Sequence, residues 1–163
     1  MIQTGDIVLF SNKGLISSLI KFVTKSKYSH VGIVMRVFDN QETLIAESLD
    51  KGFTVNRYYT PNLLKKCKVG HIFKQMDHPH RIVFRSHITK FLGLKYDWSA
   101  IFSILRSILT GRAMEHDTSR QLICSEAVVR IYKSMKLDIS EGKPADYVTP
   151  GDLARNKKIT WRN

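Results

Sequence analysis

The sequence predicts an α+β protein with an antiparallel sheet of about five strands followed by a helical part. Short segments with a period-two alternation of apolar residues fill most of the first half of the chain, and helical patterns follow in the second half. No linker, repeat or low-complexity tract separates the two halves. Strands segregated from helices are typical of α+β proteins, and 163 residues are enough for one hydrophobic core. We therefore expect a single domain over 1–163.

The first half contains the expected strands and one short helix. Strand-like patterns cover 5–10, 29–38, 43–48, 53–58 and 67–73, which we expect to form a meander. Asp39-Asn40 is expected to be a two-residue turn, because both residue types tolerate left-handed backbone geometry. A second turn is expected at 50–52. Between the first two strands, apolar residues at helical spacing predict a short helix over 13–25.

The second half predicts the helices. Pro79 suits the first turn of a helix that runs to Phe91 or Leu92 and stops at Gly93. Further helices are expected at 98–109 and 123–135, with a polar loop at 111–121 between them. The segment 149–152, with the sequence Thr-Pro-Gly-Asp, is expected to cap a short last helix.

Composition bounds the class of protein. Two cysteines, Cys67 and Cys124, are too few for a disulfide framework in a chain of this size. No apolar run is long enough to span a bilayer, and the N-terminus lacks the pattern of a signal peptide, so we expect a cytoplasmic protein. The net charge of +12 favours polyanionic partners, such as nucleic acid, an anionic membrane surface or another acidic polymer.

His30 is the most unusual residue of the predicted sheet. It lies in a strand that is otherwise apolar, and it shares a face with Gly32 two residues later. A glycine inside a strand often marks a place where another group must approach closely. A single strand histidine is more often structural than catalytic, so other residues must decide between these roles.

Cys124 is the candidate nucleophile. It lies within a turn of the start of the helix expected at 123–135, where unpaired backbone N–H groups and the helix dipole favour a thiolate. A buried, unreactive thiol is the alternative for Cys124. Cys67, among lysines in an expected strand, has no comparable setting, and we expect it to be inert.

Glu47 is the candidate for the group that orients His30. If the Asp39-Asn40 turn pairs Phe38 with Gln41, Gly32 lies opposite Glu47. Glu47 is then a diagonal neighbour of His30 on the same face of the sheet, within reach of its side chain. A slip of the register by one residue would move Glu47 to the other face.

Five motifs, in this order, resemble those of the permuted papain-like hydrolases. They are Gly5-Asp6-Ile7-Val8-Leu9-Phe10, Ser29-His30-Val31-Gly32-Ile33-Val34, Ala46-Glu47-Ser48, Tyr96-Asp97-Trp98 and Cys124-Ser125-Glu126. The resemblance is to the circularly permuted NlpC-type family, in particular its YaeF/YiiX branch, with lecithin retinol acyltransferase as a distant relative. In papain the cysteine precedes the histidine, whereas in this family, as here, the histidine comes first.

The resemblance implies a thiol hydrolase with Cys124 as nucleophile, His30 as base and Glu47 as third member. Such an enzyme acts as an amidase or peptidase on an amide or ester, through an acyl-enzyme and without a cofactor. The implied substrates are peptides, acylated amines or lipid-like molecules. Backbone N–H groups near Cys124, with the Tyr28 hydroxyl, are candidates for stabilising the oxyanion. Tyr96 and Trp98 are candidates for lining the substrate cleft.

Two other interpretations have less support. The imidazoles of His71, His78, His80 and His87, with Asp77, suggest a metal site, but their spacing matches no common ligand set, so we expect no metal. A non-catalytic basic module that binds nucleic acid or anionic membrane would explain the charge. It lacks a nucleic-acid motif, and from the sequence we expect no strongly amphipathic membrane-surface helix.

Overall fold

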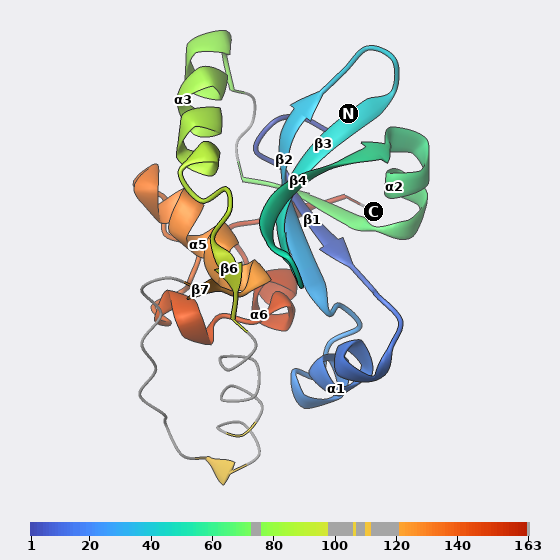
Figure 1. Cartoon of the computed structure of the whole chain (residues 1–163), viewed down its shortest axis with the longest axis vertical. Helices are drawn as coiled ribbons and strands as arrows, with labels where there is room; N and C mark the ends of the chain where they lie inside the picture. Colours follow the sequence, from blue (N-terminus) through green and yellow to red (C-terminus); the bar gives the residue numbers. More distant parts are fainter. Residues whose placement is uncertain (73–75, 98–105, 107–109, 112–120, 163) are drawn as a thin grey trace.

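The computed structural model describes residues 1–72, 76–97, 106, 110–111 and 121–162, and they form an α+β fold as predicted (Figure 1). The strands are β1 (Ile7–Phe10), β2 (His30–Val37), β3 (Glu42–Leu49), β4 (Gly52–Tyr59), β5 (Lys68–His71), β6 (Lys95–Tyr96), β7 (Gln121–Leu122) and β8 (Thr160–Trp161). The helices of the described part are α1 (Leu15–Val23), α2 (Thr60–Lys66), α3 (His78–Thr89), α5 (Cys124–Ser134), α6 (Pro150–Arg155) and the short 3-10 helix η1 (Ala145–Tyr147).

The main sheet has six antiparallel strands in the order β4-β3-β2-β1-β5-β8, while β6 and β7 form a separate parallel pair. The expected meander is wrong at β5, which pairs with β1 and not with β4. The helix α2 connects β4 to β5 and allows β5 to lie beside β1. This helix has only seven residues, so its sequence shows no clear helical period. Cys67 ends this helix and does not lie in a strand.

The hairpin of β2 and β3 has the predicted register at Gly32, but its loop and its strand pairing near the loop differ from the prediction. Gly32 pairs with Glu47 as predicted, but the Phe38 N–H donates to the Glu42 carbonyl (2.9 Å). The loop therefore has three residues, and the last of them, Gln41, has a left-handed φ of 64°. A β-bulge between Val34 and Arg36 then inserts one extra residue into β2 and cancels the offset.

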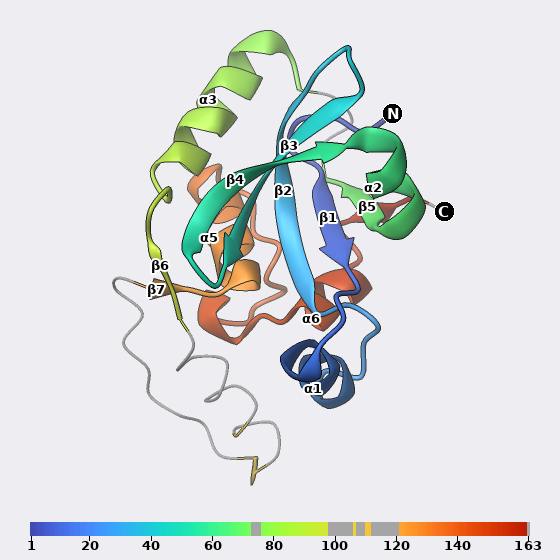
Figure 2. The same cartoon turned by 45° about the vertical axis from the view of Figure 1, so that its right-hand side comes forward.

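The sheet separates two apolar clusters, because successive residues of a strand face opposite sides. Ile33 belongs to the larger cluster, which includes Val128 of α5. Val34 belongs to the smaller cluster, which includes Leu63 of α2. The two views in Figures 1 and 2 place α5 and α2 on opposite sides of the sheet.

Most helix predictions in the described residues are confirmed. Asp77 caps α3 by accepting the His80 N–H (3.0 Å), and Pro79 lies in the first turn as predicted. Thr149 and Asp152 form the capping box that starts α6. The helix expected at 98–109 and most of the expected loop at 111–121 lie outside the described residues. Within the described part, no helix has the length and apolar character needed to cross a membrane.

Candidate active site

Cys124 is the first residue of α5, in agreement with its predicted place within a turn of the start of this helix. The rest of α5 is fixed in place because residues such as Val128, Ile131 and Tyr132 are almost completely buried in the larger cluster. The N–H groups of the first helical turn have no acceptor within the helix. The Cys124 side chain, which is 6% exposed, therefore lies next to a ready source of hydrogen-bond donors.

His30 is the first residue of β2 and is 7% exposed. It pairs with Phe10 of β1, and the two rings pack with their centroids 5.3 Å apart. An imidazole buried against an aromatic ring needs polar partners for its ring nitrogens. It finds two of them, one on β3 and one on α5.

The first partner of His30 is Glu47, whose Oε2 lies 2.7 Å from Nε2 of the imidazole. The predicted register makes this contact possible, since Gly32 pairs directly with Glu47. A Cβ atom on Gly32 would lie 2.5 Å from Cγ2 of Ile45 and 3.3 Å from Cβ of Glu47. The glycine is therefore required for the close approach of β3 that brings Glu47 to His30.

The other oxygen of the Glu47 carboxylate is also fully engaged. Oε1 accepts hydrogen bonds from Nδ2 of Asn56 (2.9 Å) and from the Tyr58 hydroxyl (2.6 Å). Burial alone would raise the pKa of Glu47, but the contacts with His30, Tyr58 and Asn56 together lower it. Glu47 is thus held as a carboxylate although it is only 1% exposed.

The second group beside His30 is Cys124, whose effect on the ring is the largest of those that raise the pKa of His30. Because Nε2 contacts Glu47, Nδ1 is the nitrogen left for the sulfur. Burial would lower the pKa of His30, but the neighbouring Cys124 and the Glu47 carboxylate raise that pKa to about 10. This environment favours the charged form of the imidazole.

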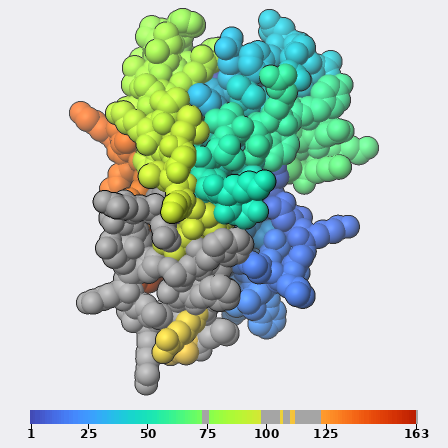
Figure 3. All heavy atoms as spheres, in the orientation of Figure 1, coloured from blue at the N-terminus to red at the C-terminus, as the bar shows by residue number. Residues whose placement is uncertain are grey.

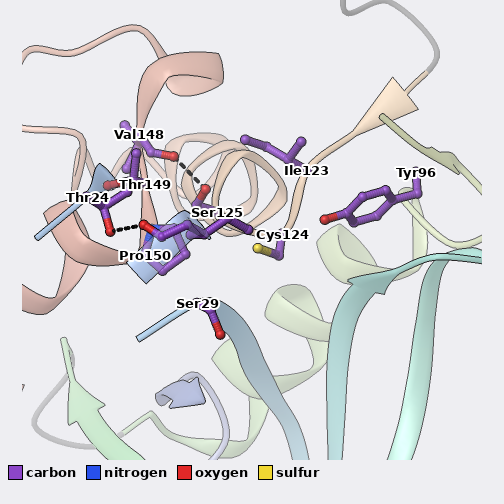
Figure 4. Close-up of a pocket in the computed structure, with 10 residues that line it drawn as sticks. Thr24, Ser29, Tyr96, Ile123, Cys124, Ser125, Val148, Thr149 and Pro150 are labelled. Atoms are coloured by element: carbon purple, nitrogen blue, oxygen red, sulfur yellow. Dashed lines mark hydrogen bonds between the residues drawn. The ribbon is translucent and has the colours of Figure 1, made fainter. Parts of the chain in front are cut away.

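A small pocket of about 30 Å³ adjoins Cys124. It is lined mainly by apolar groups from α1, β6, the start of α5 and the segments that lead into β2 and α6: Ile20, Thr24, Ser29, Tyr96, Ile123, Cys124, Ser125, Val148, Thr149 and Pro150. In Figure 4 the Tyr96 hydroxyl points toward the Cys124 side chain, and Ser125 donates to the Val148 carbonyl. Burial and the nearby charge of Cys124 raise the pKa of Tyr96, which keeps its hydroxyl protonated as a donor.

Of the other predicted site residues, Tyr28 does not join the site. Tyr28 is half-buried against the larger cluster and is not among the described residues that line the pocket. Trp98 lies outside the described residues. Cys67 is far from the conditions of a reactive thiol, because burial and the Glu47 charge raise its pKa to about 11.

Three of the four histidines considered as metal ligands have separate partners. His71 contacts Asp6 (2.6 Å), His80 contacts Asp77 (2.6 Å) and His87 contacts Ser134 (2.8 Å). In the part of the chain that the structure describes, no group of three or more His, Cys, Asp or Glu side chains is arranged to hold a metal ion.

Three residues of the site escaped the sequence analysis: Phe10, Asn56 and Tyr58. Asn56 and Tyr58 alternate along β4 on the face that Glu47 shares, because Glu47 pairs with Thr54. The short turn at 50–52 and the period-two pattern of the strand were enough to predict that Asn56 and Tyr58 share a face with Glu47. The choice of Tyr58 as a donor to Glu47 depends on how far the side chains reach along the sheet, which no sequence pattern specifies.

No protein-family model matches the chain, and no curated protein matches it. Among solved structures it is similar to the metalloprotein yiiX from Escherichia coli O157:H7, a DUF1105 protein. The TM-score is 0.70 with 18% sequence identity, over 99% of this chain and 96% of that chain. The chain therefore shares the fold of yiiX, which agrees with the branch that its motifs resemble.

Proposed function

We propose that the protein is a cysteine hydrolase of the permuted papain-like type, with Cys124 as nucleophile, His30 as general base and Glu47 as orienting residue. The observation that carries this proposal is the buried His30 ring, which Glu47 holds at 2.7 Å and whose pKa the neighbouring Cys124 raises. A nucleophile, a base and a third group that orients the base are the parts that nucleophilic acyl transfer requires.

The proposed reaction has two stages. The Cys124 thiolate attacks the carbonyl carbon of an amide or ester, and the tetrahedral intermediate expels the amine or alcohol after protonation by the His30 imidazolium. A thioester on Cys124 remains. Water then attacks the thioester, His30 accepts a proton from the water, and the acid product leaves as the thiolate is restored.

Two sets of donors are available for the oxyanion of the intermediate. The unpaired N–H groups at the start of α5 lie next to the sulfur and carry the positive end of the helix dipole. The Tyr96 hydroxyl points to the same place (Figure 4). We assign Tyr96, rather than Tyr28, as the side chain that assists, because Tyr96 lines the pocket of Cys124.

The role of Glu47 follows from its three hydrogen bonds. They fix the carboxylate so that it accepts the Nε2–H of His30, which leaves Nδ1 facing the sulfur. The negative charge of Glu47 also stabilises the imidazolium that forms when the thiol proton is transferred. Peptides, acylated amines and lipid-like esters or amides remain the proposed substrates.

Trapping of the acyl-enzyme tests this proposal. The protein is mixed with an activated ester, such as p-nitrophenyl acetate, and intact-mass and peptide mass spectrometry locate the added acyl group. We expect acylation on Cys124 that decays as product forms, in the wild type and in Cys67→Ser. Cys124→Ser should give no such intermediate, and acylation that is equal at Cys67 and Cys124 would contradict the proposal.

A non-catalytic basic module is the second candidate, because the net charge of +12 favours anionic partners. Retention on DNA or on anionic vesicles that falls with salt and persists in Cys124→Ala, together with no acylation of Cys124, would favour it.

A further inference from the structure

The outer face of α1 is apolar and exposed. Leu15 is 92% exposed and Phe22 is 78% exposed, while Ile16 and Leu19 are each 42% exposed. These four side chains follow each other at helical spacing and form one stripe, which we call the α1 face. A stripe of this kind normally turns toward the core. Here the core receives only Val23, with Ile20 packed beside it.

The position of α1 makes this face accessible. Figures 1 and 2 show α1 beyond the ends of β1 and β2, away from α2 and α3. Figure 3 shows the segment that contains it, in blue, at the surface of the molecule. Contiguous exposed apolar residues on a protein mark an interaction surface.

The charged residues within α1 and next to it in the sequence are all positive. Lys13, Lys21, Lys25 and Lys27 lie on or next to α1, and the sequence has no acidic residue between Asp6 and Asp39. Lys13, Lys25 and Lys27 are exposed. Lys21 is held near the helix because its Nζ donates to the Asn12 carbonyl (2.9 Å).

We propose that the α1 face docks onto the surface of an anionic lipid bilayer. Leucine and phenylalanine on one side of a helix, with lysines around them, are the features of a helix that lies in a membrane interface. The apolar side chains enter the boundary of the acyl chains, and the lysines contact the anionic head groups. From the sequence we expected no such helix, whereas the exposure of Leu15 and Phe22 supports the proposal of one.

Other occupants fit the charges less well. In a symmetric dimer formed through the α1 face, the lysines of one copy would lie against the same lysines of the other, which is repulsive. Nucleic acid would match the lysines but would leave the four apolar side chains without a partner. An anionic bilayer matches both features.

Docking would also bring the candidate active site to the membrane. Ile20 and Thr24, on the inner side of α1, line the pocket next to Cys124. A bilayer in contact with the outer side of α1 is therefore one helix away from this pocket. This consequence rests on the proposed function, whereas the docking itself does not.

Vesicle co-sedimentation of the full-length protein tests the docking. The vesicles are phosphatidylcholine alone or phosphatidylcholine with about one third phosphatidylglycerol, at low and physiological salt. We expect the wild type to bind the anionic vesicles with an affinity that falls as salt rises. The double variant Leu15→Ser/Phe22→Ser should bind at least about tenfold more weakly, since both side chains lose their burial in lipid.

The control is Ile82→Ser/Val83→Ser on α3, a second pair of exposed apolar side chains, which are 53% and 47% exposed. This control should bind like the wild type. Circular dichroism confirms that both variants are folded, which is expected because the substituted side chains are exposed. Lys25→Gln/Lys27→Gln should reduce the salt dependence of binding.

Three results would overturn the docking proposal. They are a wild type that does not bind anionic vesicles, a Leu15→Ser/Phe22→Ser variant that binds equally well, and light scattering that shows a wild-type dimer which this variant dissociates. Labelling of Cys124 with a water-soluble alkylating agent separates the two proposals. A variant that loses vesicle binding but keeps rapid labelling leaves the catalytic proposal intact, and Cys124→Ala should keep full vesicle binding.

Discussion

His30 is the residue on which the candidate site depends, because it joins a strand partner to a helix partner. Its contact with Glu47 follows from the register of one hairpin, and its contact with Cys124 follows from the packing of α5 on the sheet. The sequence identified all three residues, since each is a reactive type in a setting that does not otherwise need it. It did not identify Asn56 and Tyr58, whose side chains donate hydrogen bonds to the Glu47 carboxylate.

Loss of the Cys124 sulfur should lower the pKa of His30. Burial alone lowers this pKa, and the neighbouring Cys124 is the largest of the influences that raise it to about 10. Nuclear magnetic resonance of the labelled histidine ring carbons, followed against pH, measures the difference between the wild type and Cys124→Ala. An unchanged His30 titration would contradict the thiolate–imidazolium pair.

The β2–β3 hairpin carries the site at the scale of the element. Its loop is one residue longer than predicted, which shifts the pairing of the two strands by one residue. The bulge adds one residue to β2 and shifts the pairing back, so that Gly32 has the predicted partner. The sequence therefore predicts the pairing of Gly32 with Glu47 correctly without predicting the turn. A bulge cannot be recognised from the sequence, whereas a glycine near a histidine in a strand can, and it marks a close approach of another group.

Gly32→Ala should impair the site as well as the fold. Its Cβ would meet Ile45 at 2.5 Å, and overpacking of this kind costs about 1–3 kcal/mol of the free energy of unfolding. Gly70→Ala is the control. Its Cβ would meet Ile159 at a similar distance of 2.4 Å, but Gly70 lies on β5, which β1 separates from β2. Urea denaturation should show that both variants are destabilised, while Cys124 alkylation should slow in Gly32→Ala alone. Equal alkylation in both variants would mean that Gly32 does not position Glu47.

The order of the strands belongs to the scale of the whole molecule. We predicted the α+β class and most elements from local patterns, but not the crossing through α2 that places β5 beside β1. Short elements such as α2 and β8 form because of the surfaces they pack against. They are too short to show a helical or strand period in the sequence. The same limit applied to α1, whose apolar stripe predicts a helix but not the direction in which that stripe faces.

The stability of the molecule should depend on pH through Glu47. Its pKa is lower in the folded protein than its ordinary value of 4.5, so the carboxylate stabilises the fold above that pH and this contribution is lost as the pH falls. Urea denaturation of the wild type and Glu47→Gln at several pH values measures the effect. The wild type should be more stable at neutral pH, and the gap should narrow below pH 4.5. A gap that does not change with pH would contradict a stabilising carboxylate.

The proposed mechanism requires His30 to activate Cys124, and the rate of alkylation by iodoacetamide against pH measures this activation. Cys67→Ser serves as the background, so that Cys124 is the only thiol. We expect rapid alkylation below pH 7, where a free thiol with a pKa of about 8.5 reacts slowly, and loss of this reactivity in His30→Ala. Alkylation no faster than that of a free thiol, or equally fast in His30→Ala, would show that His30 does not activate Cys124.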